Sequence, residues 1–422
     1  MGGTEMLTGR MRTRSVVGAV LVVGLIAGTF VVTASNRGHA AARGFDGTTI
    51  TVGGLGLASN FLPGASNGAQ ARIKAFNDNN EIKGIKIKYD GFADDAQSPA
   101  TALSEVRRLV TQDSVFAIVP ALSQYVPGDF ITQQKVPVFG WGFSPAYCSP
   151  KPTTSGWAYG WSGCQNNPEA PVVPDGGKTS YAYVSKKTGK QHPTITLVSN
   201  DSEGGKQGVE LAKIYLAGAG FKVTGTNNQM PATAVADYTP YAQAAMKGSD
   251  GKAPDAILCI LSTDCLGLYD KISASGYQGT FMSPLYSDIL VKALNGSAVS
   301  TLFVPFSQQT AGVEQLKQAL DAYQPGLSAK VDTPTFAAYA SMDMFIQALK
   351  VAAKGGVSKI TPEAVQKAAS TMTWKIDGLA GPVIYPKASQ VSYPWCSAIS
   401  VSDGTKWTQV EAFSCSKKQF KK

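Results

Sequence analysis

The chain has 422 residues and a formal net charge of +9. That length exceeds what one hydrophobic core usually supports, so two or three domains are expected. Much of the charge lies at the two ends: five basic residues and one acid fall within 1–43, and the last six residues include Lys417, Lys418, Lys421 and Lys422. The sequence between is near neutral and has no basic stripe interleaved with aromatic residues, which argues against nucleic acid binding.

The first 42 residues have the features of an export signal. An apolar run at 16–32 is followed by small residues at 40–42 and preceded by three arginines, Arg10, Arg12 and Arg14. We predict a signal peptide over 1–42 that is cleaved near Ala42. The alternative is a retained membrane anchor, because the run approaches the roughly 20 residues that span a bilayer. No cysteine directly follows the run, so lipid attachment there is excluded.

Strand-like and helix-like segments alternate from residue 48 onward, and a small, polar or glycine-rich turn follows each strand. The predicted strands are 48–52, 85–89 and 115–119, and the turns after them are 53–56, 94–99 and 121–123. The unbroken apolar run at 115–119 is typical of a strand buried on both faces. This alternation predicts a parallel open sheet, which binds ligands at the carboxyl ends of its strands.

A second unit of the same plan follows a bridge rich in proline, glycine and serine at 149–189. Its predicted strands are 194–198, 221–223 and 256–261, with one helix after residue 202 and another ending at Gly276. Beyond residue 280 we predict a strand at 281–283, a helix at 336–354, a strand at 382–385 and a hairpin around Asp403-Gly404.

Several of these residues carry a family resemblance. They are Asp95 with Pro99 four positions later, the strand-end Ser123, and the run 136–139 leading into Ser144-Pro145. The segment resembles the first lobe of the leucine/isoleucine/valine-binding protein family, the type I solute-binding proteins of ABC importers, and the similarity continues to about residue 383.

The resemblance implies an α/β chain with two doubly wound parallel-sheet lobes joined by a hinge, the type I periplasmic-binding-protein fold. It places lobe 1 at 47–165 plus 281–372 and lobe 2 at 166–280 plus 373–422. Closure of the cleft between two such lobes over a ligand is a recognised motion.

The six cysteines form three local pairs: Cys148 with Cys164, Cys259 with Cys265, and Cys396 with Cys415. Six cysteines allow 15 pairings, but each of these pairs closes a short loop and an exported chain enters an oxidising compartment. We therefore predict three disulfides. A metal site is not expected, because the chain has only two histidines and no Cys-x-x-Cys.

No catalytic constellation is present in the sequence. Gly54-x-Gly56 lacks the third glycine of a dinucleotide fingerprint, and no phosphate-binding Walker loop occurs. We predict neither a cofactor nor enzymatic activity.

Two loops of the first lobe are candidates for ligand contact. Ser123 and Gln124 follow a strand, where a hydroxyl and backbone amides can hold a carboxylate, although helix capping by Ser123 is an equal alternative. The second loop is Trp141, Gly142, Phe143 and Ser144, in which glycine permits close approach and the aromatics form an apolar wall unless one ring faces the core. The resemblance adds Phe61 as an aromatic near the ligand.

The second lobe supplies the corresponding loops: Asp201 and Glu203, then Ser262, Thr263 and Asp264, and Tyr286 on the hinge side. The Cys259–Cys265 disulfide would preorganise the middle loop. The alternative is that this disulfide only stabilises the fold. The family usually carries a hydroxyl, a tyrosine and an acid where this chain has Phe143, Glu203 and Leu285. A buried ammonium group needs an anion or several acceptors, so we predict an apolar or aromatic carboxylate, or an amino acid if Glu203 or Asp264 receives the ammonium.

These features together predict an extracytoplasmic solute-binding protein, either associated with the cell surface or secreted. It would act as a monomer, bind a small molecule and deliver it to an ABC-type membrane permease. One alternative is an extracellular ligand sensor on the same fold, anchored by 16–32. The other is a secreted enzyme.

Overall fold

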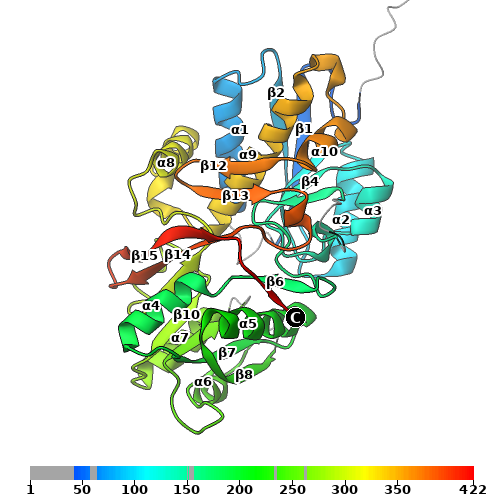
Figure 1. Cartoon of the computed structure of the whole chain (residues 1–422). Coiled ribbons are helices and arrows are strands. Elements are labelled where there is room, and N and C mark those ends of the chain that lie inside the picture. Colours follow the sequence, from blue (N-terminus) through cyan, green and yellow to red (C-terminus); the bar gives the residue numbers. More distant parts are fainter. Residues whose placement is uncertain (1–41, 58–63, 150, 152–155, 232–234, 261–263) are drawn as a thin grey trace, which may run out of the picture. The chain divides into compact units, whose positions relative to one another are not determined.

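The computed structural model describes residues 42–57, 64–149, 151, 156–231, 235–260 and 264–422 (Figure 1). The predicted signal peptide or anchor lies outside these ranges. Within them, no helix is both long and apolar enough to cross a membrane.

The first sheet has five parallel strands in the order β2-β1-β3-β4-β5. They are β1 (Thr49–Gly56), β2 (Lys86–Asp94), β3 (Ala117–Leu122), β4 (Val138–Gly140) and β5 (Ala158–Gly160). All residues of β3 are buried, as the unbroken apolar run predicts for a strand covered on both faces. The predicted parallel sheet is therefore confirmed.

Helices cover both faces of this sheet. One face carries α2 (Pro99–Thr111) and α3 (Gly128–Gln133), and the other carries α1 (Ala65–Asp78) and the long, almost fully buried α9 (Thr333–Ala353). The side chain of Phe345 on α9 packs against Phe139 on β4, with ring centroids 5.5 Å apart. Two further helices, α8 (Ala311–Tyr323) and α10 (Pro362–Ala369), pack beside α1 and α9 respectively.

The second sheet has seven strands in the order β15-β14-β11-β10-β9-β7-β8. They are β7 (Thr194–Asn200), β8 (Lys222–Met230), β9 (Ala256–Cys259), β10 (Thr280–Ser283), β11 (Ala298–Thr301), β14 (Trp395–Ser402) and β15 (Trp407–Ser416). The strands from β11 to β8 are parallel, whereas β14 and β15 are antiparallel additions at one edge. The accompanying helices are α4 (Lys178–Thr188), α5 (Glu203–Ala219), α6 (Thr239–Ala245) and α7 (Cys265–Ala274).

Two segments lie elsewhere than the resemblance implied. The strand at 281–283 and β11 belong to the seven-stranded sheet, because Phe281 and Met282 of β10 pair with Ile257 and Leu258 of β9. The hairpin of β12 (Thr373–Ile376) and β13 (Ala380–Ile384) joins neither large sheet. It packs on α9, where the indole nitrogen of Trp374 donates to an Asp343 oxygen at 3.0 Å. The lobe boundaries themselves remain a prediction.

All three predicted disulfides are confirmed. Cys396 and Cys415 face each other across the β14–β15 hairpin, which turns at the predicted Asp403-Gly404. The chain then ends in β16 (Gln419–Lys421), paired with β6 (Val172–Pro174) beside α5 (Figure 1). Four short 3-10 helices complete the described elements: η1 (Pro145–Tyr147), η2 (Leu327–Lys330), η3 (Val357–Lys359) and η4 (Lys387–Ser389).

Arg43 fastens the beginning of the described chain to the amino edge of the five-stranded sheet. Its guanidinium donates to the carbonyl of Val115, just before β3, at 3.0 Å. It also donates to the carbonyls of Gln134 and Lys135, just before β4, at 2.8 and 3.1 Å. One side chain thereby donates to three backbone carbonyls.

Candidate ligand-binding site

Loops from the carboxyl edges of the two large sheets meet at one place. On the first sheet, the loop after β3 contains Gln124, and on the second, the loop after β7 leads into α5 at residue 203. A Cβ atom placed on Gly204 would lie 3.4 Å from the side-chain oxygen of Gln124. Parallel sheets bind ligands at this edge, so these loops form a candidate binding cleft.

Ser123 lies buried at the end of β3, with 1% of its surface exposed. Its hydroxyl oxygen accepts the backbone N–H of Tyr125 at 2.9 Å, which closes a local turn. It does not cap α3, whose N-cap residue is Pro127. The hydroxyl hydrogen can still be donated to a ligand oxygen. The Gln124 side chain is exposed.

The loop after β4 forms an aromatic wall. The rings of Trp141 and Phe143 are half-buried and their centroids are 5.2 Å apart. Trp141 also contacts Trp161, with centroids 5.7 Å apart. Ser144 is buried and caps η1 through a 3.4 Å bond from the N–H of Ala146, so its observed role is structural.

Gly142 lets this loop pass close to the loop after β5. Its φ is +101°, and a Cβ atom there would lie 1.9 Å from the carbonyl oxygen of Gly163. Only glycine adopts this conformation without strain and also leaves room for the carbonyl.

We expect Gly142→Ala to displace the aromatic wall and to destabilise the protein by about 1–3 kcal/mol. Urea unfolding followed by tryptophan fluorescence measures the change. Gly156→Ala is the control, because a Cβ atom there meets nothing within 4 Å. Equal unfolding midpoints for the two variants would contradict the expected strain.

Tyr286 lies inside the protein, with 1% of its surface exposed. Its ring packs between those of Trp407 and Phe306, at centroid distances of 5.3 and 5.1 Å. Burial raises the pKa of Asp288 nearby to about 6, although the Tyr286 hydroxyl and Lys317 act in the opposite direction. Tyr286, which the sequence predicts to contact the ligand, is thus part of an aromatic core cluster in this structure.

On the second sheet, Asp201 is exposed directly after β7, and Ser202 caps α5 by accepting the N–H of Gly205 at 3.0 Å. Asp264 accepts the hydroxyl of Tyr238 at 2.7 Å. Burial and this carboxylate together raise the pKa of Tyr238 to about 12. Asp264 therefore has a protein partner that a ligand ammonium group would have to compete with.

Three predicted site residues, Phe61, Ser262 and Thr263, lie outside the described residues, as does the side chain of Glu203. Leu285 is half-buried, and its backbone N–H donates to the Ser283 hydroxyl at 3.0 Å.

Sequence reasoning missed Trp161. The neighbouring strands β4 and β5 both end in an aromatic residue and a glycine, a tryptophan directly follows each strand, and Gly140 pairs with Gly160 in register. This repeat places Trp161 beside Trp141 at the carboxyl edge of the sheet. The repeated pattern is visible in the sequence and is the signal that identifies the second tryptophan.

The fold and its facing loops define a two-lobed α/β binding protein. The family model described as "Periplasmic binding protein" matches residues 49–400, which is most of the chain. The chain belongs to the periplasmic binding protein family. This family consists of extracytoplasmic solute-binding proteins, not enzymes, that bind small molecules and deliver them to ABC transporter permeases.

Solved structures share the fold at low sequence identity. A fatty acid ABC transporter substrate-binding protein from Thermomonospora curvata is 16% identical with a TM-score of 0.70, covering 90% of this chain and 96% of that one. An ABC transporter solute-binding protein from R. palustris in complex with benzoate is 13% identical with a TM-score of 0.68, covering 88% and 98%.

The branched-chain amino acid transporter substrate-binding protein of Streptococcus pneumoniae, in complex with isoleucine, is 18% identical with a TM-score of 0.62. The alignment covers 87% of this chain and 100% of that one. A comparison with curated protein sequences finds no match. The resemblance to leucine/isoleucine/valine-binding proteins and the type I fold predicted from the sequence are both confirmed.

Proposed function

We propose that this chain is the solute-binding protein of an ABC-type importer and holds a small molecule between the carboxyl edges of its two sheets. The observation that carries the proposal is the approach of Gln124, after β3, to Gly204, at the start of α5. A ligand between these loops would contact both lobes at once, which couples binding to closure. The predicted lobe boundaries, signal peptide and monomeric state belong to the same proposal.

The ligand we propose has an apolar or aromatic body and a carboxylate. Trp141 and Phe143 supply an apolar surface, and the Ser123 hydroxyl with nearby backbone amides supplies donors for a carboxylate. Leu285 offers no anion to an ammonium group, and Asp264 already accepts the Tyr238 hydroxyl. The structural neighbours whose names mention fatty acids and benzoate support a carboxylic acid as the ligand. Because another neighbour is in complex with isoleucine, an amino acid is the second candidate.

We expect benzoate and hexanoate to bind more tightly than leucine, isoleucine or valine. Each unpaired polar group costs about 1–3 kcal/mol, so two missing partners weaken an amino acid by roughly a hundredfold. Thermal shift identifies ligands, because one that binds only the native state raises Tm, and calorimetry then gives Kd. Micromolar binding of leucine that is lost in Glu203→Gln or Asp264→Asn would contradict the proposed ligand class.

Trp141→Ala serves as the site variant in the same experiment and should weaken the acids. The matched control is Phe130→Ala, because Phe130 is another half-buried ring of the first lobe but packs beside α2, away from the aromatic wall. If both variants bind the acids as the native chain does, the aromatic wall is not part of the site.

The sensor alternative differs from the importer in its amino terminus. A mature chain that begins near Ala42 supports a cleaved, released binding protein, whereas a chain that retains 16–32 supports an anchored sensor. Intact-mass measurement of the exported protein distinguishes the two.

A further inference from the structure

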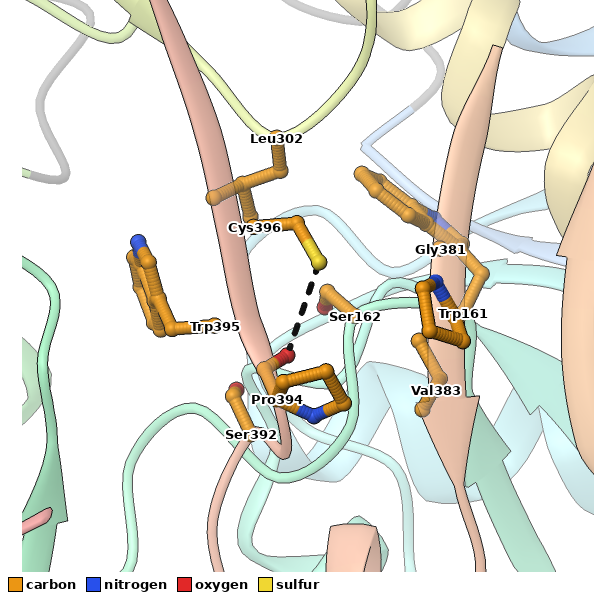
Figure 2. Close-up of a pocket in the computed structure, with 10 residues that line it drawn as sticks. Trp161, Ser162, Leu302, Gly381, Val383, Ser392, Pro394, Trp395 and Cys396 are labelled. Atoms are coloured by element: carbon orange, nitrogen blue, oxygen red, sulfur yellow. Dashed lines mark hydrogen bonds between the residues drawn. The ribbon is translucent and has the colours of Figure 1, made fainter. Parts of the chain in front are cut away.

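A cavity of about 20 Å³ lies beside the start of β14. Figure 2 shows Ser392, Pro394 and Cys396 along one side of it and Trp161, Gly381 and Val383 along the other, with Leu302 above. These residues come from the loop after β5, the segment after β11, β13, and the start of β14 with the segment before it. The volume accommodates one oxygen-sized group but not a whole ligand.

Trp161 brings a free hydrogen-bond donor to this cavity. Its side chain is 1% exposed, and its indole nitrogen has no hydrogen-bond partner among the described residues. An indole N–H can only donate, and a buried donor without a partner is unfavourable. An acceptor atom in the cavity would give this donor a partner.

The two hydroxyls of the cavity already use their hydrogens. The Ser162 hydroxyl donates to the carbonyl of Trp141, and the Ser392 hydroxyl donates to the carbonyl of Cys164 at 3.1 Å. The indole nitrogen of Trp395, which like that of Trp161 has no hydrogen-bond partner among the described residues, lies on the other side of β14 (Figure 2). The remaining walls are largely apolar, including Leu302, Val383 and Pro394. The cavity thus favours a single oxygen that accepts one hydrogen bond.

The position of Trp161 shows which part of a ligand reaches it. Its ring contacts Trp141 of the aromatic wall at a centroid distance of 5.7 Å. It follows β5, two strands away from β3 and Ser123, which is roughly 10 Å at the usual strand spacing. One carboxylate group does not span that distance.

We propose that Trp161 donates a hydrogen bond to a second oxygen of the ligand, at the end opposite the carboxylate. The ligand class is then an acid whose apolar or aromatic body carries a distal carbonyl, ether or hydroxyl oxygen. This inference rests on the proposed function, since it assigns the carboxylate to Ser123 and the body to Trp141.

The test compares two acids of the same shape, 4-acetylbenzoate and 4-isopropylbenzoate, which differ in the distal carbonyl oxygen. Calorimetry should give about tenfold tighter binding of the acetyl compound, as one neutral hydrogen bond provides. In Trp161→Phe the ratio should fall to about one. In Trp395→Phe it should persist, because that indole lines the same cavity but Figure 2 places its nitrogen on the other side of β14 from Trp161.

A second measurement uses the native chain, so it does not require that any variant folds. In the native chain labelled with 15N-tryptophan, the Trp161 indole N–H resonance should shift on saturation with 4-acetylbenzoate and much less with 4-isopropylbenzoate. Equal affinities, or an unmoved Trp161 resonance at saturation, would overturn the inference and leave the proposed function standing. Failure of every acid, benzoate and hexanoate included, to bind would overturn both.

Discussion

Replacing Arg72 by methionine is expected to lower the free energy of unfolding by about 3–5 kcal/mol. Arg72 is 5% exposed and donates to both oxygens of Glu81, at 2.6 and 3.1 Å, and to Asp343 at 2.9 Å. It thereby connects α1, the turn after it and α9. Methionine fills much of the volume but leaves two partly buried carboxylates without their main counter-charge. Urea unfolding at matched m values measures the loss.

The control is Arg108→Met. Arg108 pairs with Glu105 at 2.9 Å and with Asp113, but its side chain is 40% exposed, so water replaces both partners. Its loss should cost less than about 1 kcal/mol. Similar losses in the two variants would show that burial does not govern the contribution of Arg72.

The difference between native chain and Arg72→Met should also depend on pH. Burial tends to raise the pKa of Glu81, but hydrogen bonds and charge from Arg72 and Lys350 outweigh it and lower the pKa below 4.5. A lowered native pKa contributes stability above the ordinary value, and this contribution is lost as the pH falls through the native pKa. The stability difference should therefore be larger at pH 7 than at pH 3.5.

Gly68→Ala is expected to destabilise the protein by about 1–3 kcal/mol, even though alanine is the better helix former by about 1 kcal/mol. Gly68 lies in α1 where that helix crosses the beginning of α9. A Cβ atom there would lie 1.9 Å from the carbonyl oxygen of Thr335 and 3.1 Å from the backbone nitrogen of Tyr339. The two helices would have to separate, and thermal unfolding should show a lower Tm.

Gly128→Ala is the matched control for this helix substitution. Gly128 begins α3, and a Cβ atom there meets only Ala146 at an ordinary 3.5 Å. Alanine should be neutral or slightly stabilising at this position. A Gly68→Ala variant as stable as Gly128→Ala would mean that α1 and α9 separate at little cost.

The strands of both sheets could largely be predicted because local runs of apolar residues indicate buried strands. Residues 115–119 form an apolar run with no polar interruption, and β3 is buried along its whole length. The sheet that a strand joins could not be predicted in the same way. Nothing in Phe281 and Met282 distinguishes a strand of the first lobe from one of the second, since either sheet buries them equally well.

The candidate site was less accessible to sequence reasoning, because ring packing depends on elements far apart in the chain. Tyr286 follows a strand like the other candidates. Its ring nevertheless stacks on that of Trp407, which lies more than a hundred residues later in the chain. Ser123 was recognised from its place at a strand end, but its turn with Tyr125 depends on a backbone path that composition does not specify.

The Arg43 contacts bear on how binding experiments can be arranged. They hold the start of the described chain before β3 and β4, whereas the loops that contain Ser123 and Trp141 leave those strands at the opposite ends. A chain captured on a biosensor surface through a linker ahead of Arg43 would present the candidate cleft away from the support. Coupling through the many surface lysines would instead orient the molecules at random and block some of the sites.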